Sequence, residues 1–387
     1  MTFAALPPVR RPVPVRRGTC RAGLSMPRFF GDRPITLYAS GTAALARALA
    51  LCAARASVSA PEAVIPAYGC PDLVAACIHA TVSPRLVDVA SSGWSYDLDQ
   101  LLHNLSSRTV AIVSVNLLGI ADETPALADL CRPRSIPLIQ DSAQFLPRQP
   151  TAWPGDYIIL SFGRGKPLNL LHGGALIEPV NAVADHAAHA PSNTFRDRLL
   201  NSSPAALAFN FLTRPYPYGI LSRLPGNSFG RVVYEPLRNP SPLPPSNWAR
   251  VDAAFHQYQR QRSYDRQIWT PALTEWASFG IRPLLPVGST FEPEPLRLTL
   301  LAPDRASRDA VMHRLSRAHL GASRLYGADL SHIAGVPSEV RDQGPFPHAA
   351  ALADTLFTLP THSLISDRIV RQTAACIRDW HRSRRTK

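Results

Sequence analysis

Lysine is almost absent from this chain of 387 residues: Lys166 and Lys387 are its two lysines, and every other basic residue is arginine. The two cations differ chemically, because arginine stays protonated at any usable pH, whereas a lysine amine can lose its proton and attack a carbonyl. An interior lysine kept among arginines therefore marks a candidate site for a neutral amine. Composition alone leaves open the alternative that this lysine is a statistical remnant with no function.

Cysteine motifs and long apolar runs are absent as well. The six cysteines show neither CxxC spacing nor regular intervals, which argues against a zinc site and a disulfide scaffold. No stretch of 18 uninterrupted apolar residues occurs, and residues 1–18 hold no apolar core of signal-peptide length. We therefore expect a cytoplasmic protein with no transmembrane segment and no metal site.

The charge is strongly of one sign, with a formal net charge of +13 at pH 7. Basic tails bind nucleic acid or anionic membranes in some proteins and form a solvated fringe in others. The sequence holds no RNP-like aromatic motif, zinc-finger spacing or heptad repeat, so we favour the solvated fringe and expect no nucleic-acid partner. The basic residues near the two ends are Arg10, Arg11, Arg16, Arg17, Arg21, Arg378, Arg382, Arg384, Arg385 and Lys387.

Proline and the hydrophobic pattern divide the chain into three regions. Residues 1–32 form a basic arm, since the run PPVRRPVPVRR can hold neither a helix nor a central strand. A large α/β domain is expected over residues 33–245, where short apolar strands alternate with helices; this predicts a mostly parallel, doubly wound sheet. A smaller α+β domain is expected over residues 246–387.

Individual elements follow from the same pattern. A helix over residues 43–55 should begin at Thr42 as N-cap, and a long helix over 250–267 should bury Val251, Ala254, Phe255 and Tyr258. The other expected strands lie at 63–67, 84–89, 109–115, 136–141, 156–162 and 173–179, the other helices at 73–79, 97–103 and 125–131, and the elements of the smaller domain at 295–303, 307–321, 354–362 and 366–380.

Asp141 gives the interior lysine a chemical partner. It ends the strand expected at 136–141, at the carboxyl edge where parallel sheets bind ligands, and Lys166 follows the next strand. Pyridoxal phosphate requires such a pair: an amine to hold its aldehyde, and an acid to keep its ring nitrogen protonated. Its phosphate could rest on Ser40, Gly41 and Thr42 at a helix N-terminus, with the Ser161 hydroxyl added. An ordinary helix cap is the alternative for that triplet.

Together these motifs resemble the DegT/StrS family of pyridoxal-phosphate-dependent sugar aminotransferases. ASGTAAL, VIPAYGCPD, PRLVDV, SVNLLG, LIQDSAQ, LSFGRGKPLNLLHGGALI and FTLPTHSLISDRIV follow in the family's order, from about residue 33 to the end. The resemblance implies an aspartate-aminotransferase-like fold (fold type I) and a homodimer. It also implies amino transfer from a donor such as glutamate to a nucleotide-linked keto sugar, in amino-sugar or polysaccharide biosynthesis.

The resemblance also implies roles for individual residues. Lys166 matches the lysine that forms the Schiff base, Asp141 the partner of the ring nitrogen, and Gln144 the glutamine near the ring and its phenolic oxygen. Gly41, Thr42 and Ser161 match phosphate contacts. Asn116 stands where the family often has a polar residue close to the ring, and a strand-end cap is its alternative interpretation.

Two positions depart from the family pattern. Where members have a flat side chain stacked on the ring, this sequence has Cys70, and Tyr68 is the alternative stacking residue. In the family, an asparagine that precedes a helix reaches the phosphate bound in the partner subunit. Asn247 also precedes a helix, but its spacing from that helix is shorter than in the family.

Other functions fit less well. GRGKP is no P-loop, because Leu160 replaces the first glycine and Pro167 removes the Mg²⁺ ligand. Arg164 contacts an anion or is a solvated loop residue, and His172 is a loop residue. Relatives that dehydrate sugars replace the lysine, so Lys166 favours transamination. A non-catalytic module that binds through its basic tails is the alternative of another class.

Overall fold

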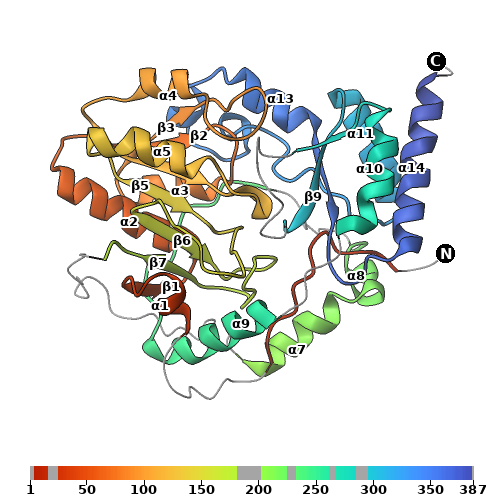
Figure 1. Cartoon of the computed structure of the whole chain (residues 1–387), viewed down its shortest axis with the longest axis horizontal. Coiled ribbons are helices and arrows are strands. Elements are labelled where there is room, and N and C mark those ends of the chain that lie inside the picture. Colours follow the sequence, from red (N-terminus) through yellow and green to blue (C-terminus); the bar gives the residue numbers. More distant parts are fainter. Residues whose placement is uncertain are drawn as a thin grey trace.

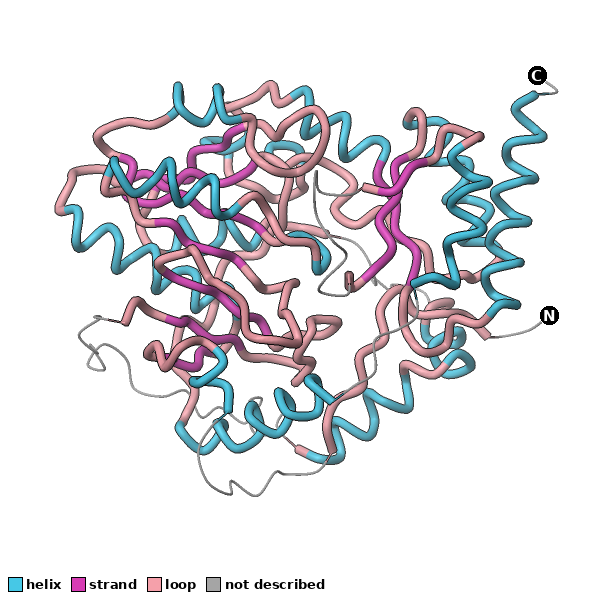
Figure 2. The backbone as a smooth tube through the Cα atoms, viewed as in Figure 1, coloured by secondary structure: helices cyan, strands magenta, loops and turns pink. Residues whose placement is uncertain are grey.

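The computed structural model describes residues 4–15, 25–180, 202–224, 232–260, 266–284 and 295–385. In these ranges a seven-stranded sheet and a three-stranded sheet lie side by side (Figures 1 and 2). The order of the large sheet is β1-β7-β6-β5-β4-β2-β3. Its strands are β1 (Ile35–Tyr38), β2 (Glu62–Pro66), β3 (Ser83–Val87), β4 (Thr109–Val115), β5 (Leu138–Asp141), β6 (Tyr157–Ser161) and β7 (Gly174–Ile177).

The large sheet is mostly parallel. Strands β3, β2, β4, β5 and β6 pair in parallel, and β7 runs antiparallel to both of its neighbours, β6 and β1. The α/β class with a mostly parallel sheet, expected from the sequence, is therefore confirmed.

Helices cover both faces of this sheet. Ala63 and Ile65 of β2 belong to a core shared with α2 (Gly41–Ala56) and α3 (Asp72–His79). Val64, between them, belongs to a core shared with α4 (Leu98–Asn104) and α5 (Thr124–Cys131). Successive side chains of a strand point to opposite faces, so a strand buried on both faces must be apolar throughout.

The smaller sheet is antiparallel, in the order β10 (Leu356–Pro360), β9 (Arg297–Leu301) and β8 (Arg282–Pro283). Leu300 and Phe357 pack into a core with α10 (Thr270–Ala277), α11 (Arg305–Arg317) and α14 (Asp367–Arg385). The remaining elements are α1 (Ser25–Phe29), α7 (Ser203–Leu212), α8 (Pro215–Leu221), α9 (Trp248–Arg260), α12 (Ser338–Arg341) and α13 (Pro347–Thr355), with 3-10 turns at Leu117–Gly119, Arg132–Arg134, Pro245–Asn247, Arg266–Trp269 and Leu330–His332.

Two local expectations need correction. The N-cap of α2 is Ser40, whose hydroxyl accepts a hydrogen bond from the Ala43 amide at 3.0 Å, so the expected cap at Thr42 is wrong by two residues. A serine cap reaches the amide three residues on, which is the geometry found here. Helix α9 ends at Arg260; residues 261–265 lie outside the described part, so the expected extension to 267 is not traced. The four apolar residues expected to be buried on this helix are buried.

The division between two domains near residue 245 stays a prediction. Leu330, Val340 and Leu356 lie beyond that boundary but share the core of α2 and α3. The C-terminal part of the chain thus contributes to the packing of both sheets.

Residues 4–15, called the strap below, run from beside the smaller sheet toward α7 and α9 (Figure 1). The amide of Leu6 donates to His319 O at 2.9 Å, and Asn169 Nδ2 donates to Arg11 O at 2.6 Å. The amide of Val13 donates to Asn210 Oδ1 at 2.8 Å. Arg11 is only 6% exposed, so the expectation of a solvated fringe is wrong for this stretch. An extended segment without its own helix or strand satisfies its backbone groups through such partners.

The basic C-terminal end lies on α14, and part of it is paired. Arg378 Nη1 lies 2.9 Å from Glu275 Oε2, and Arg384 Nη2 lies 3.4 Å from Asp304 Oδ2. Arg16, Arg17, Arg21 and Lys387 lie outside the described residues. Among the described helices, none combines the length and the apolar character that a membrane span requires.

We expect the anchoring of the strap to weaken as pH falls. His362 Nε2 lies 2.9 Å from Pro7 O. Burial lowers the pKa of His362 from 6.5 to about 4, helped by Arg10 and Arg11 and opposed by the bond to Pro7. Because the folded pKa is depressed, the neutral ring stabilises the fold fully above pH 6.5, and this contribution is lost as pH falls through 4.

The measurement is urea unfolding of wild type and His362→Asn, whose amide can still donate to Pro7. Between pH 7 and pH 4.5, wild type should lose more unfolding free energy than the variant. Equal losses would contradict the assignment to His362.

Candidate functional site

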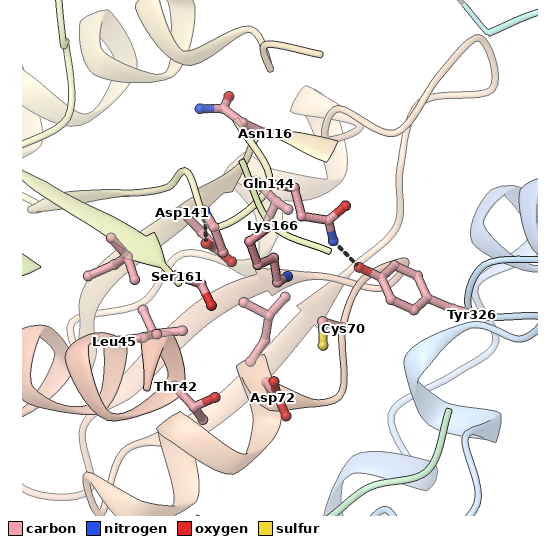
Figure 3. A pocket seen from close by; sticks show the side chains of 15 residues that line it. Thr42, Leu45, Cys70, Asp72, Asn116, Asp141, Gln144, Ser161, Lys166 and Tyr326 are labelled. Atoms are coloured by element: carbon pink, nitrogen blue, oxygen red, sulfur yellow. Dashed lines mark hydrogen bonds between the residues drawn. The ribbon is translucent and has the colours of Figure 1, made fainter. Parts of the chain in front are cut away.

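A cavity lies at the carboxyl ends of β4, β5 and β6 and contains most of the expected site (Figure 3). Of the residues expected to bind the cofactor, seven line it: Gly41, Thr42, Asn116, Asp141, Gln144, Ser161 and Lys166. Ser40 and Tyr68 do not line it. The cavity wall also includes Cys70, Asp72 and Tyr326.

Lys166 lies on the loop between β6 and β7 and extends into the middle of the cavity (Figure 3). The loop is held at its base by the Leu170 amide, which donates to Phe162 O at 2.8 Å, and the Lys166 amide donates to Gly163 O at 3.2 Å. Gly165 has a φ of +77°, and a Cβ added there would lie 3.4 Å from Val9 of the strap. The glycine permits the turn, and the strap packs against its outer side.

Asp141 ends β5, next to the strand that leads to Lys166. Its Oδ1 accepts a hydrogen bond from the Ala143 amide at 2.9 Å. Burial raises the pKa of Asp141 above its ordinary value of 3.8, while the Ala143 amide and the charge of Lys166 act in the opposite direction. A cation brought next to this carboxyl would favour its ionised form.

The start of α2 forms the lower side of the cavity. The amides of Ala43 and Ala44 bond to the Ser40 side chain and carbonyl, so the earlier N–H groups of Gly41 and Thr42 are not used inside the helix. A Cβ on Gly41 would lie 2.8 Å from Ser161 Cβ. The absence of that atom keeps the helix end close to the Ser161 hydroxyl, which suits an anion such as phosphate.

Gln144 connects the cavity to the smaller sheet. Its Oε1 accepts from the Leu118 amide at 3.1 Å, and its Nε2 donates to Tyr326 Oη at 2.8 Å (Figure 3). Leu118 has a φ of +53°, a conformation that is uncommon outside glycine. The Leu118 carbonyl in turn accepts from the Leu296 amide at 2.7 Å, just before β9.

At the position where family members stack a flat side chain on the cofactor ring, Cys70 rather than Tyr68 lies in the cavity wall. Burial raises the pKa of Cys70 well above its usual range, so its thiol is neutral and soft rather than nucleophilic. Tyr68 is 1% exposed and packs edge to face on Tyr326, with ring centroids 5.5 Å apart. Tyr68 therefore supports Tyr326 from behind.

Asn116 serves the backbone around it. Its Nδ2 donates to Ser142 Oγ at 2.8 Å, and its Oδ1 accepts from the Asp122 amide at 2.8 Å. Its amide points away from Lys166 (Figure 3), which is the strand-end role named as the alternative. Asn247 Nδ2 donates to Pro244 O at 3.2 Å. Neither Asn247, Arg164 nor His172 lines the cavity, and Arg164 is exposed.

Tyr326, Asp72 and Leu118 were missed by the sequence reasoning. Tyr326 follows no strand or motif that signals a site, and it reaches the cavity only because the two sheets meet there. Asp72 stood in the quoted motif VIPAYGCPD, directly after Pro71, and that position could have signalled it. Leu118 would require a signal for positive φ, which leucine does not give.

The residues present fit pyridoxal phosphate. Lys166 provides an amine for the aldehyde, Asp141 a desolvated acid for the ring nitrogen, and α2 with Ser161 an anion cradle. These three groups approach one cavity from different sides, as Figure 3 shows. No group in the set requires a metal ion.

Comparison with known proteins supports the same chemistry. Residues 25–204 match the DegT/DnrJ/EryC1/StrS aminotransferase family. An L-glutamine:scyllo-inosose aminotransferase of Streptomyces griseus is 29% identical over 165 residues, which cover 42% of this chain and 38% of that protein. A putative L-glutamine:3-amino-2,3-dideoxy-scyllo-inosose aminotransferase of Micromonospora echinospora is 30% identical over 107 residues, which cover 28% and 25%. The matches thus span well under two thirds of these relatives.

Solved structures share the fold over almost the whole chain. The PLP-form of the putative sugar aminotransferase Spr1654 from Streptococcus pneumoniae superposes with a TM-score of 0.64 at 17% identity, covering 95% of this chain and 92% of that one. A putative PLP-dependent aminotransferase from Bacillus cereus gives 0.65 at 15% identity, covering 96% and 99%. The expected fold type I architecture is confirmed.

We expect the buried carboxyl of Asp141 to destabilise the protein without cofactor at neutral pH. Its folded pKa is raised, so its contribution to stability is complete below pH 3.8 and is lost as pH rises through the folded value. Asp141→Asn is neutral at every pH and removes this loss. Without cofactor, the variant should melt about 2 °C above wild type at pH 7.5.

Scanning calorimetry at pH 4 and pH 7.5 measures the difference, which should shrink toward pH 4. The same variant should bind pyridoxal phosphate more weakly than wild type. A wild type that melts higher at pH 7.5 would contradict the desolvation of Asp141.

Proposed function

We propose that this chain, whose residues 25–204 belong to the DegT/DnrJ/EryC1/StrS aminotransferase family, is a pyridoxal-phosphate-dependent aminotransferase. One observation carries the proposal: the amine of Lys166 and the carboxyl of Asp141 line a single cavity whose third side is the N-terminus of α2. The three groups match the aldehyde, ring nitrogen and phosphate of one molecule.

Each residue has a definite task in this function. Pyridoxal phosphate, when bound, supplies an electron sink and carries the amino group from donor to acceptor. Lys166 Nζ holds the cofactor between turnovers and, once released, moves a proton to and from the substrate carbon. Asp141 keeps the proton on the ring nitrogen through a charge-assisted hydrogen bond, worth about 1.5 to 3 kcal/mol.

Gln144 and the N-terminus of α2 would hold the bound cofactor in addition to Lys166 and Asp141. Both polar atoms of the Gln144 side-chain amide are hydrogen-bonded, Oε1 to Leu118 and Nε2 to Tyr326. The amide is therefore not free to rotate. The amides of Gly41 and Thr42 with the Ser161 hydroxyl hold the phosphate. At the position of the family's flat side chain, Cys70 would present a thiol rather than an aromatic face to the ring.

The proposed substrates are an amino acid donor, glutamate in the family resemblance, and a keto sugar linked to a nucleotide. The names of the curated relatives give glutamine as donor and an inosose as acceptor, which is a keto cyclitol. We further propose a homodimer that works in the cytoplasm, in amino-sugar or polysaccharide biosynthesis.

Lys166→Arg tests the proposed attachment. Wild type incubated with pyridoxal phosphate should turn yellow, and borohydride should fix the cofactor to the peptide that contains Lys166, as found by mass spectrometry. The arginine variant keeps the charge but cannot form the bond, so borohydride should fix no cofactor to its peptide around residue 166. Its transamination should fall by about 10²- to 10⁴-fold or more.

Arg164→Gln is the matched control, since Arg164 lies on the same loop but is exposed and outside the cavity. It should keep the adduct and the colour. An adduct that persists in Lys166→Arg would show that another group binds the cofactor.

A screen of acceptors tests the proposed substrate class. Each donor, L-glutamate or L-glutamine, is paired with nucleotide-linked keto sugars and with scyllo-inosose, and products are identified by mass spectrometry. We expect a product whose mass corresponds to a nucleotide-linked keto sugar with one amino group in place of the keto oxygen. Amination of scyllo-inosose alone would instead show that this chain uses the acceptor class named for its curated relatives. The absence of any aminated product would contradict the proposal.

A further inference from the structure

The loop that carries Lys166 closes on itself between Gly163 and Leu171, which form an isolated β-bridge. Within it, Gly165 has a φ of +77° and Leu171 a φ of +73°. A leucine with positive φ is uncommon, and such a conformation persists where the surroundings determine it. Pro167 also restricts the backbone of Lys166, because helical conformations are disfavoured for the residue before a proline. The position of the lysine amine therefore depends on what holds the loop as a whole.

Asn169 holds this loop through both polar atoms of its side chain. It is only 3% exposed, and its Oδ1 accepts a hydrogen bond from the Leu171 amide at 3.1 Å. Its Nδ2 donates to Arg11 O of the strap at 2.6 Å. The bond to Leu171 supports the positive φ of that residue, and the bond to Arg11 ties the loop to a segment 158 residues away in the sequence. The loop is thereby anchored to the strap as well as to its own strands.

The strap also packs on the outer side of the loop. A Cβ added to Gly165 would lie 3.4 Å from Val9 Cγ1, which is ordinary van der Waals contact. Nearby, the packing is incomplete: a second, smaller cavity lies where the strap, the loop and α9 meet, with Pro12, Pro167 and Gln257 in its wall. Interiors are otherwise densely packed, so this space gives the loop room to move. The contacts with the strap limit that movement.

We propose that Asn169 is a positioning residue for Lys166, and that it acts by tying the Lys166 loop to the strap. This inference rests on the proposed aminotransferase function, in which Lys166 Nζ holds the cofactor and then moves a proton. Both tasks require the amine at a defined place, and a displacement of about 1 Å can lower a rate by about 100-fold. The strap thus supports the catalytic lysine, although none of its described residues lines the main cavity.

Labelling of the protein without cofactor tests this, because Lys166 and Lys387 are the only lysines of the chain. Trace acetylation with acetic anhydride, read by mass spectrometry, gives the reactivity of Lys166 relative to Lys387 in the same sample. In Asn169→Ala the loop is released from the strap, so water and reagent should reach the amine more often. The relative reactivity of Lys166 should rise by about 2- to 10-fold, the factor that corresponds to one lost hydrogen bond.

The kinetics of the same variant, loaded with cofactor, give a second readout. The kcat for the half-reaction with the amino donor should fall by about 10- to 100-fold, because the amine is displaced from the reacting atoms. The KM for the donor should stay within about twofold, since Asn169 does not touch the cavity. A merely structural role would lower the melting temperature and leave labelling and kcat unchanged well below the transition.

Asn210→Ala is the matched control. Asn210 also ties the strap through a side-chain amide, to the backbone of Val13, but it lies on α7 rather than on the Lys166 loop. This variant should melt lower than wild type and keep the wild-type labelling and kcat. Should Asn169→Ala fail to fold, Val9→Ala removes packing on Gly165 while keeping both bonds of Asn169. It should raise the reactivity of Lys166 in the same direction, and Val9→Ile should restore the wild-type value.

The outcomes separate the two proposals. Higher Lys166 reactivity in Asn169→Ala and Val9→Ala, but not in Asn210→Ala, would support the positioning role. Unchanged labelling and kcat in Asn169→Ala, or equal changes in Asn169→Ala and Asn210→Ala, would overturn it and leave the aminotransferase intact. A wild type that takes up no cofactor and transfers no amino group would overturn the proposed function, and with it the positioning role in catalysis.

Discussion

The pairing of β5 with β6 is the constraint on which the site depends. Asp141 lies opposite Ile159, so the carboxyl is fixed at the edge of the sheet just before the neighbouring strand turns into the loop of Lys166. Parallel strands end at the same edge, and the carboxyl of Asp141 and the amine of Lys166 are thereby brought to one cavity. The desolvation of Asp141 is the cost of this arrangement. The protonated ring nitrogen of a bound cofactor would offset this desolvation. The carboxyl is therefore suited to binding a ligand rather than to stabilising the fold.

A second constraint joins the two sheets through the backbone of Leu118. Leu118 donates to Gln144 and accepts from Leu296, in a backbone conformation that leucine rarely adopts. Strain of this kind persists where the surroundings determine the conformation. The consequence is that the position of β9, the packing of Tyr326 and the orientation of Gln144 are not independent, so a change in the smaller sheet is felt at the reacting centre.

Much of the fold was predictable because the signals are local. Strands such as residues 109–115 are mostly apolar, and a helix start such as that after Ser40 is marked by small polar residues. Lys166 and Asp141 followed from their chemistry and their places after strands. The rest depends on contacts between distant segments. Tyr326 and the strap acquire their surroundings only when both sheets are in place, and no periodicity or motif predicts that. Cys70 and Tyr68 could not be separated by spacing, because which of them faces the cavity depends on how Tyr326 packs.

The strap also bears on how this chain is made. Its bonding partners lie near residues 169, 210, 319 and 362, so residues 4–15 can be anchored fully only after the chain as far as residue 362 has been made. Contacts this far apart in sequence are slow to form. Anchoring of the strap can therefore be completed only after both sheets have formed, which makes it a late step of folding.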